Sequence, residues 1–196
     1  GLRTSGASLL AAGLVTVLVP RLVGVIVGRW VFKMHPGVLL GVCAGAGAMM
    51  ALAADLRLGT PAATVAFLFT RVGLAGADMG ACALLPRLIG QQRAMEMFMT
   101  SARYRPEAVA AWGLVDRMAP EGRAREGAHA LAAEIAENAP LALIATRATM
   151  RAGLVEAIRA QLNHEHAEQA VLKATADYAE GVASVFERRP ANFIGS

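Results

Sequence analysis

Residues 41–60 read GVCAGAGAMMALAADLRLGT, and the rest of the chain is best read outward from them. Small residues fill positions 44–48, where the backbone can approach other groups closely, and an apolar segment then runs to Asp55. A glycine-rich turn that opens a helix leaves unpaired backbone N–H groups at the positive end of the helix dipole. Such groups can bind a phosphate or stabilise a developing oxyanion.

The same composition also fits a helix packed so closely that only Gly and Ala are tolerated. A phosphate-binding loop is less well supported, because no Lys-Ser/Thr pair follows the glycines. Gly41, Gly45 and Gly47 also lack the G-x-G-x-x-G spacing of dinucleotide-binding turns. Spacing alone therefore leaves the oxyanion and close-packing interpretations open.

Several motifs follow this stretch in a characteristic order. They are Asp55-Leu56-Arg57-Leu58, Val72-Gly73-Leu74, Asp78-Met79-Gly80, Leu85-Pro86-Arg87-Leu88-Ile89-Gly90, Ala111-Trp112-Gly113-Leu114-Val115 and the tail Phe186-Glu187-Arg188-Arg189-Pro190-Ala191-Asn192-Phe193. With these motifs the chain resembles the enoyl-CoA hydratase/isomerase (crotonase) superfamily over residues 38–196. The resemblance implies an α/β protein with the crotonase (ClpP-like) fold, in which repeated β-β-α units form the core and C-terminal helices form a trimer.

The composition indicates one soluble-type globular unit with a substantial core. The chain has 196 residues, of which 56% are hydrophobic and 5% aromatic, so Ala, Leu, Val and Gly must fill most of the interior. Its net charge of +4 comes from scattered basic residues, without the run that a nucleic-acid-binding arm would show. Cys43 and Cys82 form neither a disulfide framework nor a C-x-x-C pair, which favours a reducing, cytoplasmic setting.

The first part of the chain, residues 1–37, departs from the family. Residues 8–28 are apolar, but Pro20 and Arg21 interrupt them, and neither half reaches the roughly 18–20 residues of a transmembrane helix. A signal peptide has a similar form, but buried strands rich in Val and Leu fit better. The resemblance also implies a first oxyanion motif, F-S/A-x-G-x-D, which is missing here. Either the protein has lost it or the sequence before Val38 is incomplete, and we favour the second interpretation.

After Val38 the pattern alternates between strands and helices. A strand is expected to end at 38–41, further strands at 55–58, 64–69 and 114–118, and a glycine-rich loop at 73–78. Helices are expected at 45–54, 80–89, 91–100 and 105–112, and then at 121–138, 142–152, 154–179 and 180–186. We therefore divide the chain into an α/β core, 1–120, and a C-terminal helical region, 121–196. The apolar stripe within 154–179 suits a roof over the core or a subunit contact.

Asp78 is the residue that the sequence singles out for chemistry. It stands in a glycine-rich loop directly before a predicted helix, where an aspartate commonly caps the helix. In the family that the chain resembles, this position carries a catalytic aspartate in dienoyl-CoA isomerases and a nucleophilic aspartate in halobenzoyl-CoA dehalogenases. The resemblance thus implies that Asp78 is the catalytic acid/base, with helix capping as the alternative.

The two glutamates that hold water in hydratases of this family are absent. By the resemblance they would stand at Met49 and within Phe69-Thr70-Arg71. Hydration needs a positioned base and acid, whereas one carboxylate can move a proton between carbons or attack as a nucleophile. Isomerisation is therefore easier to support than hydration. Dehalogenation would also need an upstream histidine and an aromatic cage, and only His35 is available, so that hypothesis ranks low.

The resemblance implies further site residues. The backbone N–H of Ala46 would be the second oxyanion donor, because a thioester carbonyl held there gains negative charge as the α-carbon loses a proton. Contacts with the substrate are expected from Gly45, Gly47, Met49, Thr70, Leu74 and Arg188, the last through a CoA phosphate. No cofactor is expected beyond the CoA of the substrate.

Other conspicuous residues have structural explanations. The group His164, Glu165, His166 and Glu168 suggests a metal site, but residues two apart do not share a helix face. We therefore expect solvated surface there and no metal. Met95, Met97 and Trp112 are expected in the core.

The sequence therefore predicts an acyl-CoA-binding enzyme of the enoyl-CoA hydratase/isomerase type, with Asp78 as acid/base. One alternative is other chemistry that depends on Asp78, namely thioester hydrolysis or dehalogenation. The second is a catalytically silent homologue that binds acyl-CoA or a partner. The expected partners are an acyl-CoA substrate and further copies of the chain, as a trimer or dimer of trimers, with neither nucleic acid nor a membrane.

Overall fold

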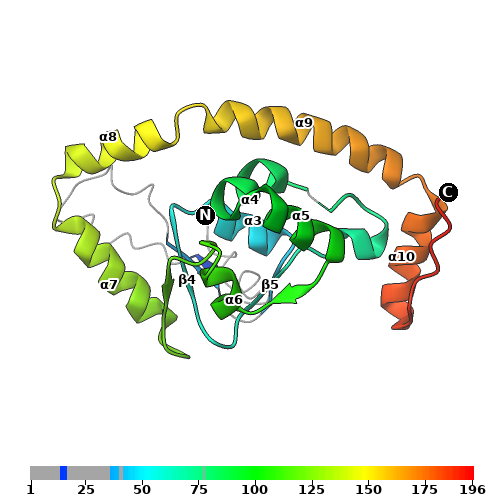
Figure 1. The fold of residues 1–196 in the computed structure, drawn as a ribbon, viewed down its shortest axis with the longest axis horizontal. Helices are drawn as coiled ribbons and strands as arrows, with labels where there is room; N and C mark the ends of the chain where they lie inside the picture. The colour runs from blue at the N-terminus through cyan, green and yellow to red at the C-terminus, as the bar shows by residue number, and fades with distance from the viewer. Residues whose placement is uncertain (1–13, 17–35, 40–41, 77) are drawn as a thin grey trace, which may run out of the picture.

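Two small β-sheets lie at the centre of the fold (Figure 1). The computed structural model describes residues 14–16, 36–39, 42–76 and 78–196. One sheet has the order β1 (Leu14–Thr16), β2 (Pro36–Leu39), β4 (Leu56–Gly59), β7 (Arg117–Met118), and the other has the order β3 (Val42–Ala44), β5 (Thr64–Ala66), β6 (Arg103–Tyr104). Within them β2 runs parallel to β4 and β3 runs parallel to β5, so the connecting segments cross over.

Short helices cover these sheets and supply most of the core. They are α3 (Ala46–Leu52), the 3-10 helix η2 (Phe69–Val72), α4 (Ala81–Ile89), α5 (Gln91–Thr100) and α6 (Pro106–Ala110). Phe67, Leu85 and Met97 are fully buried in one cluster. Phe67 meets Phe98 of α5 edge to face, with ring centroids 5.1 Å apart. Helical spacing of the apolar residues on α4 thus turns one face of that helix into the main core cluster.

The last helices form an arc around this core (Figure 1). They are α7 (Ala124–Ala136), α8 (Pro140–Met150), α9 (Leu154–Leu172) and α10 (Ala176–Glu187). At the start of the arc, Ala128 and Leu131 of α7 pack against Leu58 in a second, smaller cluster. In the middle of the arc, Leu154 and Ile158 of α9 pack against the main core. The arc is therefore fixed to the core at several points along its length.

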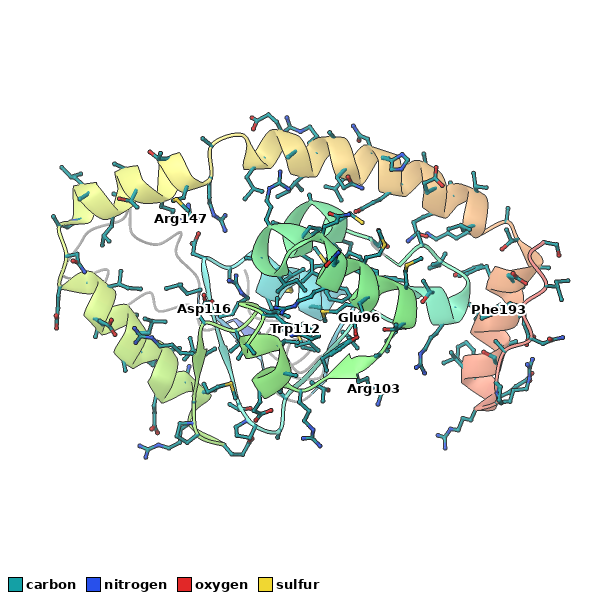
Figure 2. All side chains as sticks on the ribbon, in the orientation of Figure 1. Glu96, Arg103, Trp112, Asp116, Arg147 and Phe193 are labelled. Carbon is teal, nitrogen blue, oxygen red and sulfur yellow. The ribbon has the colours of Figure 1, made fainter. Side chains whose placement is uncertain are left out.

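Buried and half-buried charges fasten the arc and β7 to the core. Asp55, which follows α3, forms ion pairs with Arg147 and Arg151 at the end of α8, each at 2.8 Å. Arg57 on β4 is 3% exposed and pairs with Asp116 at 3.1 Å (Asp116 and Arg147 are labelled in Figure 2). A buried guanidinium without a partner would strongly destabilise the fold. These ion pairs therefore hold α8 and β7 in place against the core.

The predicted α/β class is confirmed, and most predicted helices occur within a few residues of their expected ends. Several expectations were wrong in detail, among them the strand expected at 114–118, which is limited to Arg117–Met118. The helix expected at 154–179 stops at Leu172, and α10 begins at Ala176, because the Thr175 side chain caps α10 by accepting from the Tyr178 N–H at 3.1 Å. The strand expected at 64–69 ends at Ala66. The short strand β6 was not expected.

The strands expected at the start of the chain lie mostly outside the described residues. Only β1 is described there, and it pairs antiparallel with β2. Among the helices described, none combines the length and the apolar character that crossing a bilayer would require.

Candidate functional site

The loop that carries Asp78, residues 73–76 and 78–80, joins η2 to α4. Gly73 and Gly80 have positive φ angles of 72° and 84°, which side chains other than glycine rarely adopt. The Asp78 carboxylate accepts a 2.7 Å hydrogen bond from the backbone N–H of Met79, which itself has a positive φ of 57°. The side chain is half-buried. The local glycines thus set a sharp turn at which one carboxylate is held close to its own backbone.

Two neighbouring elements approach this loop so closely that only glycine fits. A Cβ on Gly76 would lie 2.8 Å from the carbonyl oxygen of Phe98, near the end of α5. A Cβ on Gly73 would lie 2.8 Å from the backbone of Asp177 and Tyr178 on α10. Contacts below 3.0 Å with backbone atoms cannot relax by side-chain movement. The loop is therefore pressed between α5 and α10.

The helix cap expected from Asp78 is supplied by another residue. The N-cap of α4 is Gly80, and no side chain of the flanking residues caps the helix. Glu165 of α9 accepts instead from the N–H of Gly80 at 2.7 Å and from the N–H of Cys82 at 3.4 Å. Glu165 is 4% exposed, so the expectation that it belongs to a solvated surface was wrong. A carboxylate at a helix N-terminus is favoured both by hydrogen bonding and by the helix dipole.

A pocket of about 370 Å³ lies beside the loop, between α4, α5 and α9. Its walls are Thr70, Ala75, Gly76, Cys82, Met95, Phe98, Met99, Gln161, His164, Glu165 and Glu168. Burial, and secondly the charge of Glu165, raise the pKa of the Cys82 thiol, so it stays protonated near neutral pH. Met95 is 46% exposed at this wall and not in the core as expected, whereas Met97 is fully buried. The pocket offers a mainly apolar lining with carboxylates at one wall.

Among the predicted site residues, Thr70 lines the pocket and Asp78 and Leu74 belong to the adjoining loop. The Thr70 hydroxyl lies 2.5 Å from that of Ser101. Asp78 and Leu74 are not in the pocket wall. The Thr70 side chain is thus already engaged in a hydrogen bond between η2 and the end of α5.

The start of α3 holds the other predicted site residues. Gly45 is its N-cap, with φ 54° and ψ −129°, and a Cβ added there would meet no atom of the described residues within 4 Å. Ala46 and Gly47 are its first residues, whose N–H groups have no partner within the helix. Met49 is 6% exposed and packs in the main core. The expected oxyanion donors thus lie at the glycine turn that opens α3.

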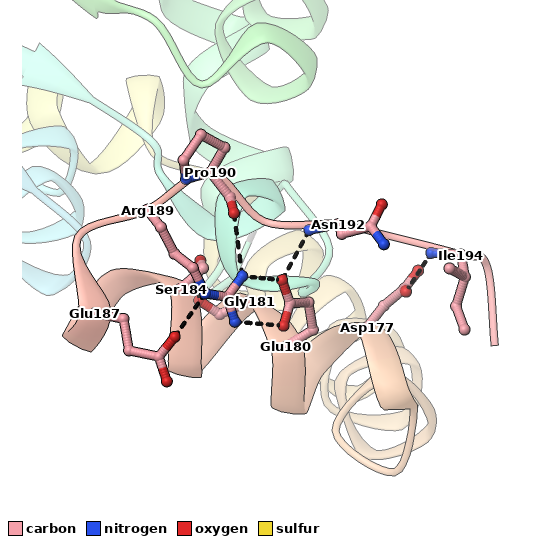
Figure 3. A network of polar contacts seen from close by, with 9 residues as sticks. All are labelled: Asp177, Glu180, Gly181, Ser184, Glu187, Arg189, Pro190, Asn192 and Ile194. Atoms are coloured by element: carbon pink, nitrogen blue, oxygen red, sulfur yellow. Dashed lines mark hydrogen bonds and ion pairs between the residues drawn. The ribbon is translucent and has the colours of Figure 1, made fainter.

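Arg188 lies away from the pocket, at the end of α10, where it is exposed and has a left-handed backbone with φ 54°. Its neighbour Arg189 holds the C-terminal tail. Figure 3 shows Arg189 bridging Glu180 and Glu187. His35 lies outside the described residues. Within the part of the chain that the structure describes, no three His, Cys, Asp or Glu side chains are grouped to hold a metal ion.

Sequence reasoning missed Glu165 and Gln169 as residues of this site. Gln169 is 3% exposed, and its Oε1 accepts from the N–H of Ala75 at 3.1 Å. The sequence did indicate that the two residues share a helix face, because they are four positions apart. Neither composition nor spacing could show that this face meets the Asp78 loop.

The sequence profile described as enoyl-CoA hydratase/isomerase matches residues 38–196. A probable enoyl-CoA hydratase from Rhodobacter capsulatus is 37% identical over 155 residues, which are 79% of this chain and 60% of that protein. The 1,2-epoxyphenylacetyl-CoA isomerase of Escherichia coli is 29% identical over 155 residues, which are 79% of this chain and 59% of that protein.

The fold is similar to that of a solved enoyl-CoA hydratase from Mycobacterium avium subsp. paratuberculosis. The TM-score is 0.74 at 31% identity, over 82% of this chain and 65% of that one. The likeness confirms the predicted fold. The chain spans about 60% of the length of the two curated relatives described above.

Proposed function

The chain belongs to the enoyl-CoA hydratase/isomerase (crotonase) family, and we propose that it binds an acyl-CoA thioester and stabilises the enolate formed from it. The observation that carries this proposal is the continuous family match over residues 38–196, which includes both the start of α3 and the Asp78 loop. In the proposed site, the N–H of Ala46 donates to the thioester oxygen as it becomes negative. Fixed backbone donors stabilise such a charge without reorganisation.

Asp78 is proposed as the acid/base. Its carboxylate removes a proton from one carbon of the acyl chain, the electron pair moves onto the thioester oxygen, and the carboxyl group returns the proton to another carbon. This sequence of steps is a double-bond isomerisation and needs one carboxylate. Because Glu165 caps α4, Asp78 is not needed as a cap. The assignment is therefore compatible with the local structure of the loop.

Isomerisation is favoured over hydration because of the residues near the expected positions of the two hydratase glutamates. Met49 is buried in the core, and Thr70 is hydrogen-bonded to Ser101. Neither can activate water as a carboxylate does. We propose further that Gly45, Gly47, Leu74 and Arg188 contact the substrate, that no other cofactor takes part, and that the reaction runs in the cytoplasm.

Calorimetry with a short enoyl-CoA and with the corresponding free acid tests this proposal. We expect saturable binding of the thioester and none of the acid at the same concentration, since the N–H donors and the CoA contacts act together. Equal binding of both compounds, or binding of neither, would contradict the proposal. Binding of the thioester without any turnover would favour the silent homologue.

A further inference from the structure

We propose that Glu165 and Gln169 of α9 are positioning residues that hold the Asp78 loop in its reactive geometry. The inference rests on the proposed acid/base role of Asp78. Neither side chain is assigned to touch the substrate. Both act through the backbone of the loop, and their contribution should be measurable in the chemical step.

Three hydrogen bonds connect the two side chains to the loop and to the start of α4. Gln169 Oε1 accepts from the Ala75 N–H at 3.1 Å, three residues before Asp78. Glu165 Oε2 accepts from the Gly80 N–H at 2.7 Å, two residues after Asp78, and its Oε1 accepts from the Cys82 N–H at 3.4 Å. The contacts therefore bracket Asp78 on both sides.

One helix face can supply all three hydrogen bonds because Glu165 and Gln169 are four residues apart. This face of α9 lies close to the loop because Leu154 and Ile158 pack on the core about two to four turns earlier in the helix. A Cβ on Gly80 would lie 3.2 Å from the Ile158 side chain, so the helix and the loop are in close contact. The distance between α9 and the loop is thus fixed by packing as well as by polar contacts.

Burial increases the energetic cost of breaking these hydrogen bonds. Glu165 and Gln169 are 4% and 3% exposed. If a buried acceptor is removed, its N–H donors are left without a hydrogen-bond partner, because water cannot reach them. The loss of stability is larger than for an exposed hydrogen bond. The amide orientation of Gln169 is set by its contact with Ala75, although its Nε2 then finds no acceptor among the described residues. The side chain thus directs its Oε1 to the Ala75 N–H, and its Nε2 is left unpaired.

Two further close contacts support the first half of the loop. Gly73 is held by α10 and Gly76 by the end of α5. After Asp78, the described hydrogen bonds from outside the loop are those that Glu165 accepts from Gly80 and Cys82, and the Ile158 side chain adds apolar packing at Gly80. Loss of the Glu165 carboxylate should therefore loosen the half of the loop that follows Asp78 and leave the start of α3 unaffected.

Glu165→Gln tests the inference, because it keeps the size of the side chain but replaces one acceptor with an amino group facing an N–H donor. We expect kcat to fall roughly 10–100-fold, since small misplacements of a catalytic group cost that much. KM should change by less than about threefold, because the oxyanion donors are untouched. Glu156→Gln is the matched control, since it makes the same change at an exposed position of α9, and it should leave kcat unchanged.

The Asp78→Asn background separates positioning from a general loss of folding. If Glu165 acts through Asp78, Glu165→Gln should cause no further loss in Asp78→Asn, whereas independent effects would multiply. Amide exchange at Gly80 and Cys82 should also be faster in Glu165→Gln than in the unmodified protein. If this variant does not fold, Gln169→Met removes the acceptor for Ala75 at similar side-chain length and should show the same pattern of kcat and KM, with faster amide exchange at Ala75.

The turnover of the single and double variants separates the positioning role of Glu165 from the proposed role of Asp78. A loss of turnover in Asp78→Asn with none in Glu165→Gln overturns the positioning role alone. Multiplying losses in the double variant do the same. Unchanged turnover in Asp78→Asn overturns the proposed function and the positioning role with it.

Discussion

At the scale of single residues, Gly181 determines how closely α10 can approach the site. A Cβ at this position would lie 2.6 Å from the backbone carbonyl carbon and Cα of Val72 in η2. Together with Gly73, which faces Asp177 and Tyr178, it allows direct contact of backbone with backbone. The position of η2, and hence of the loop that follows it, depends on this pair of glycines.

Gly181→Ala should therefore destabilise the protein although alanine is the better helix former. The gain in helix propensity is about 1 kcal/mol, while overpacking against a backbone that cannot yield costs about 1–3 kcal/mol. Gly127→Ala in α7 is the matched control, because its Cβ would meet the Leu58 and Ala119 side chains at 3.1 and 3.2 Å. Urea unfolding should show a loss for Gly181→Ala and little or no loss for Gly127→Ala. A stabilised Gly181→Ala would contradict this account.

The sequence located a local element where consecutive residues define it, and it missed contacts between residues that are far apart in the chain. The glycine-rich start of α3 and the Asp78 loop were recognisable because their residues are consecutive. Glu165 was expected on a solvated surface, because spacing identifies a helix face and not the element which that face meets. Its partner Gly80 is 85 residues away in the chain.

At the scale of elements, the C-terminal tail folds back along α10 (Figure 3). Glu180 accepts from Arg189 and, at 2.8 Å, from the N–H of Asn192, and Asp177 accepts from the N–H of Ile194 at 2.7 Å. The Arg189 guanidinium, and then the Asn192 N–H, lower the pKa of Glu180 from 4.5 to about 2. The ionised carboxylate is therefore the form that holds the tail.

The docking of the tail should depend on pH in a defined direction. A carboxyl group with a lowered pKa contributes stability that is fully present above its unfolded pKa of 4.5 and is lost as the pH falls through about 2. The amide resonance of Asn192, followed by NMR, should titrate near the lower value. A midpoint near 4.5 would show that Glu180 is not paired in solution. Glu180→Gln should show an undocked tail already at neutral pH.

The elements themselves were predictable to different degrees. Helices α4 and α5 match their expected ranges closely, since apolar spacing and the glycine between them mark their ends. The break between α9 and α10 was misplaced because Lys173–Thr175 contains neither glycine nor proline, and the cap is a threonine. The 3-10 helix η2 was missed because its sequence is rich in residues that also favour strands.

At the scale of the whole molecule, the arc of α7 to α10 leaves apolar side chains uncovered. No residue of α8, all of which the structure describes, is buried. Leu141 and Met150 on this helix are each 81% exposed, and Val171 of α9 is 68% exposed. Exposed apolar groups of this kind on neighbouring helices are typical of a subunit contact. They support the predicted trimer or dimer of trimers, which remains a prediction.

Light scattering should find a trimer or a multiple of it at micromolar concentration. Leu141→Glu should weaken the assembly, because a charge would be buried at the contact. Gln92→Glu introduces the same charge at an exposed position of α5, outside the arc, and should leave the assembly intact. A monomer across the whole concentration range would contradict the prediction.

The proton transfer by Asp78 is the central claim, and turnover by Asp78→Asn tests it most directly. Asparagine keeps the size and the hydrogen bond to the Met79 N–H but removes the base. Isomerisation of a 3-enoyl-CoA should fall about 10²–10⁴-fold, with unchanged affinity for the thioester. Melting temperature should hold, since Glu165 caps α4.

Hydration of a short 2-enoyl-CoA, measured in the same two proteins, gives the decisive contrast. We expect hydration to be weak or undetectable in the unmodified protein, because Met49 and Thr70 cannot hold and activate water. Robust hydration that survives Asp78→Asn would contradict the assignment of Asp78 as the acid/base.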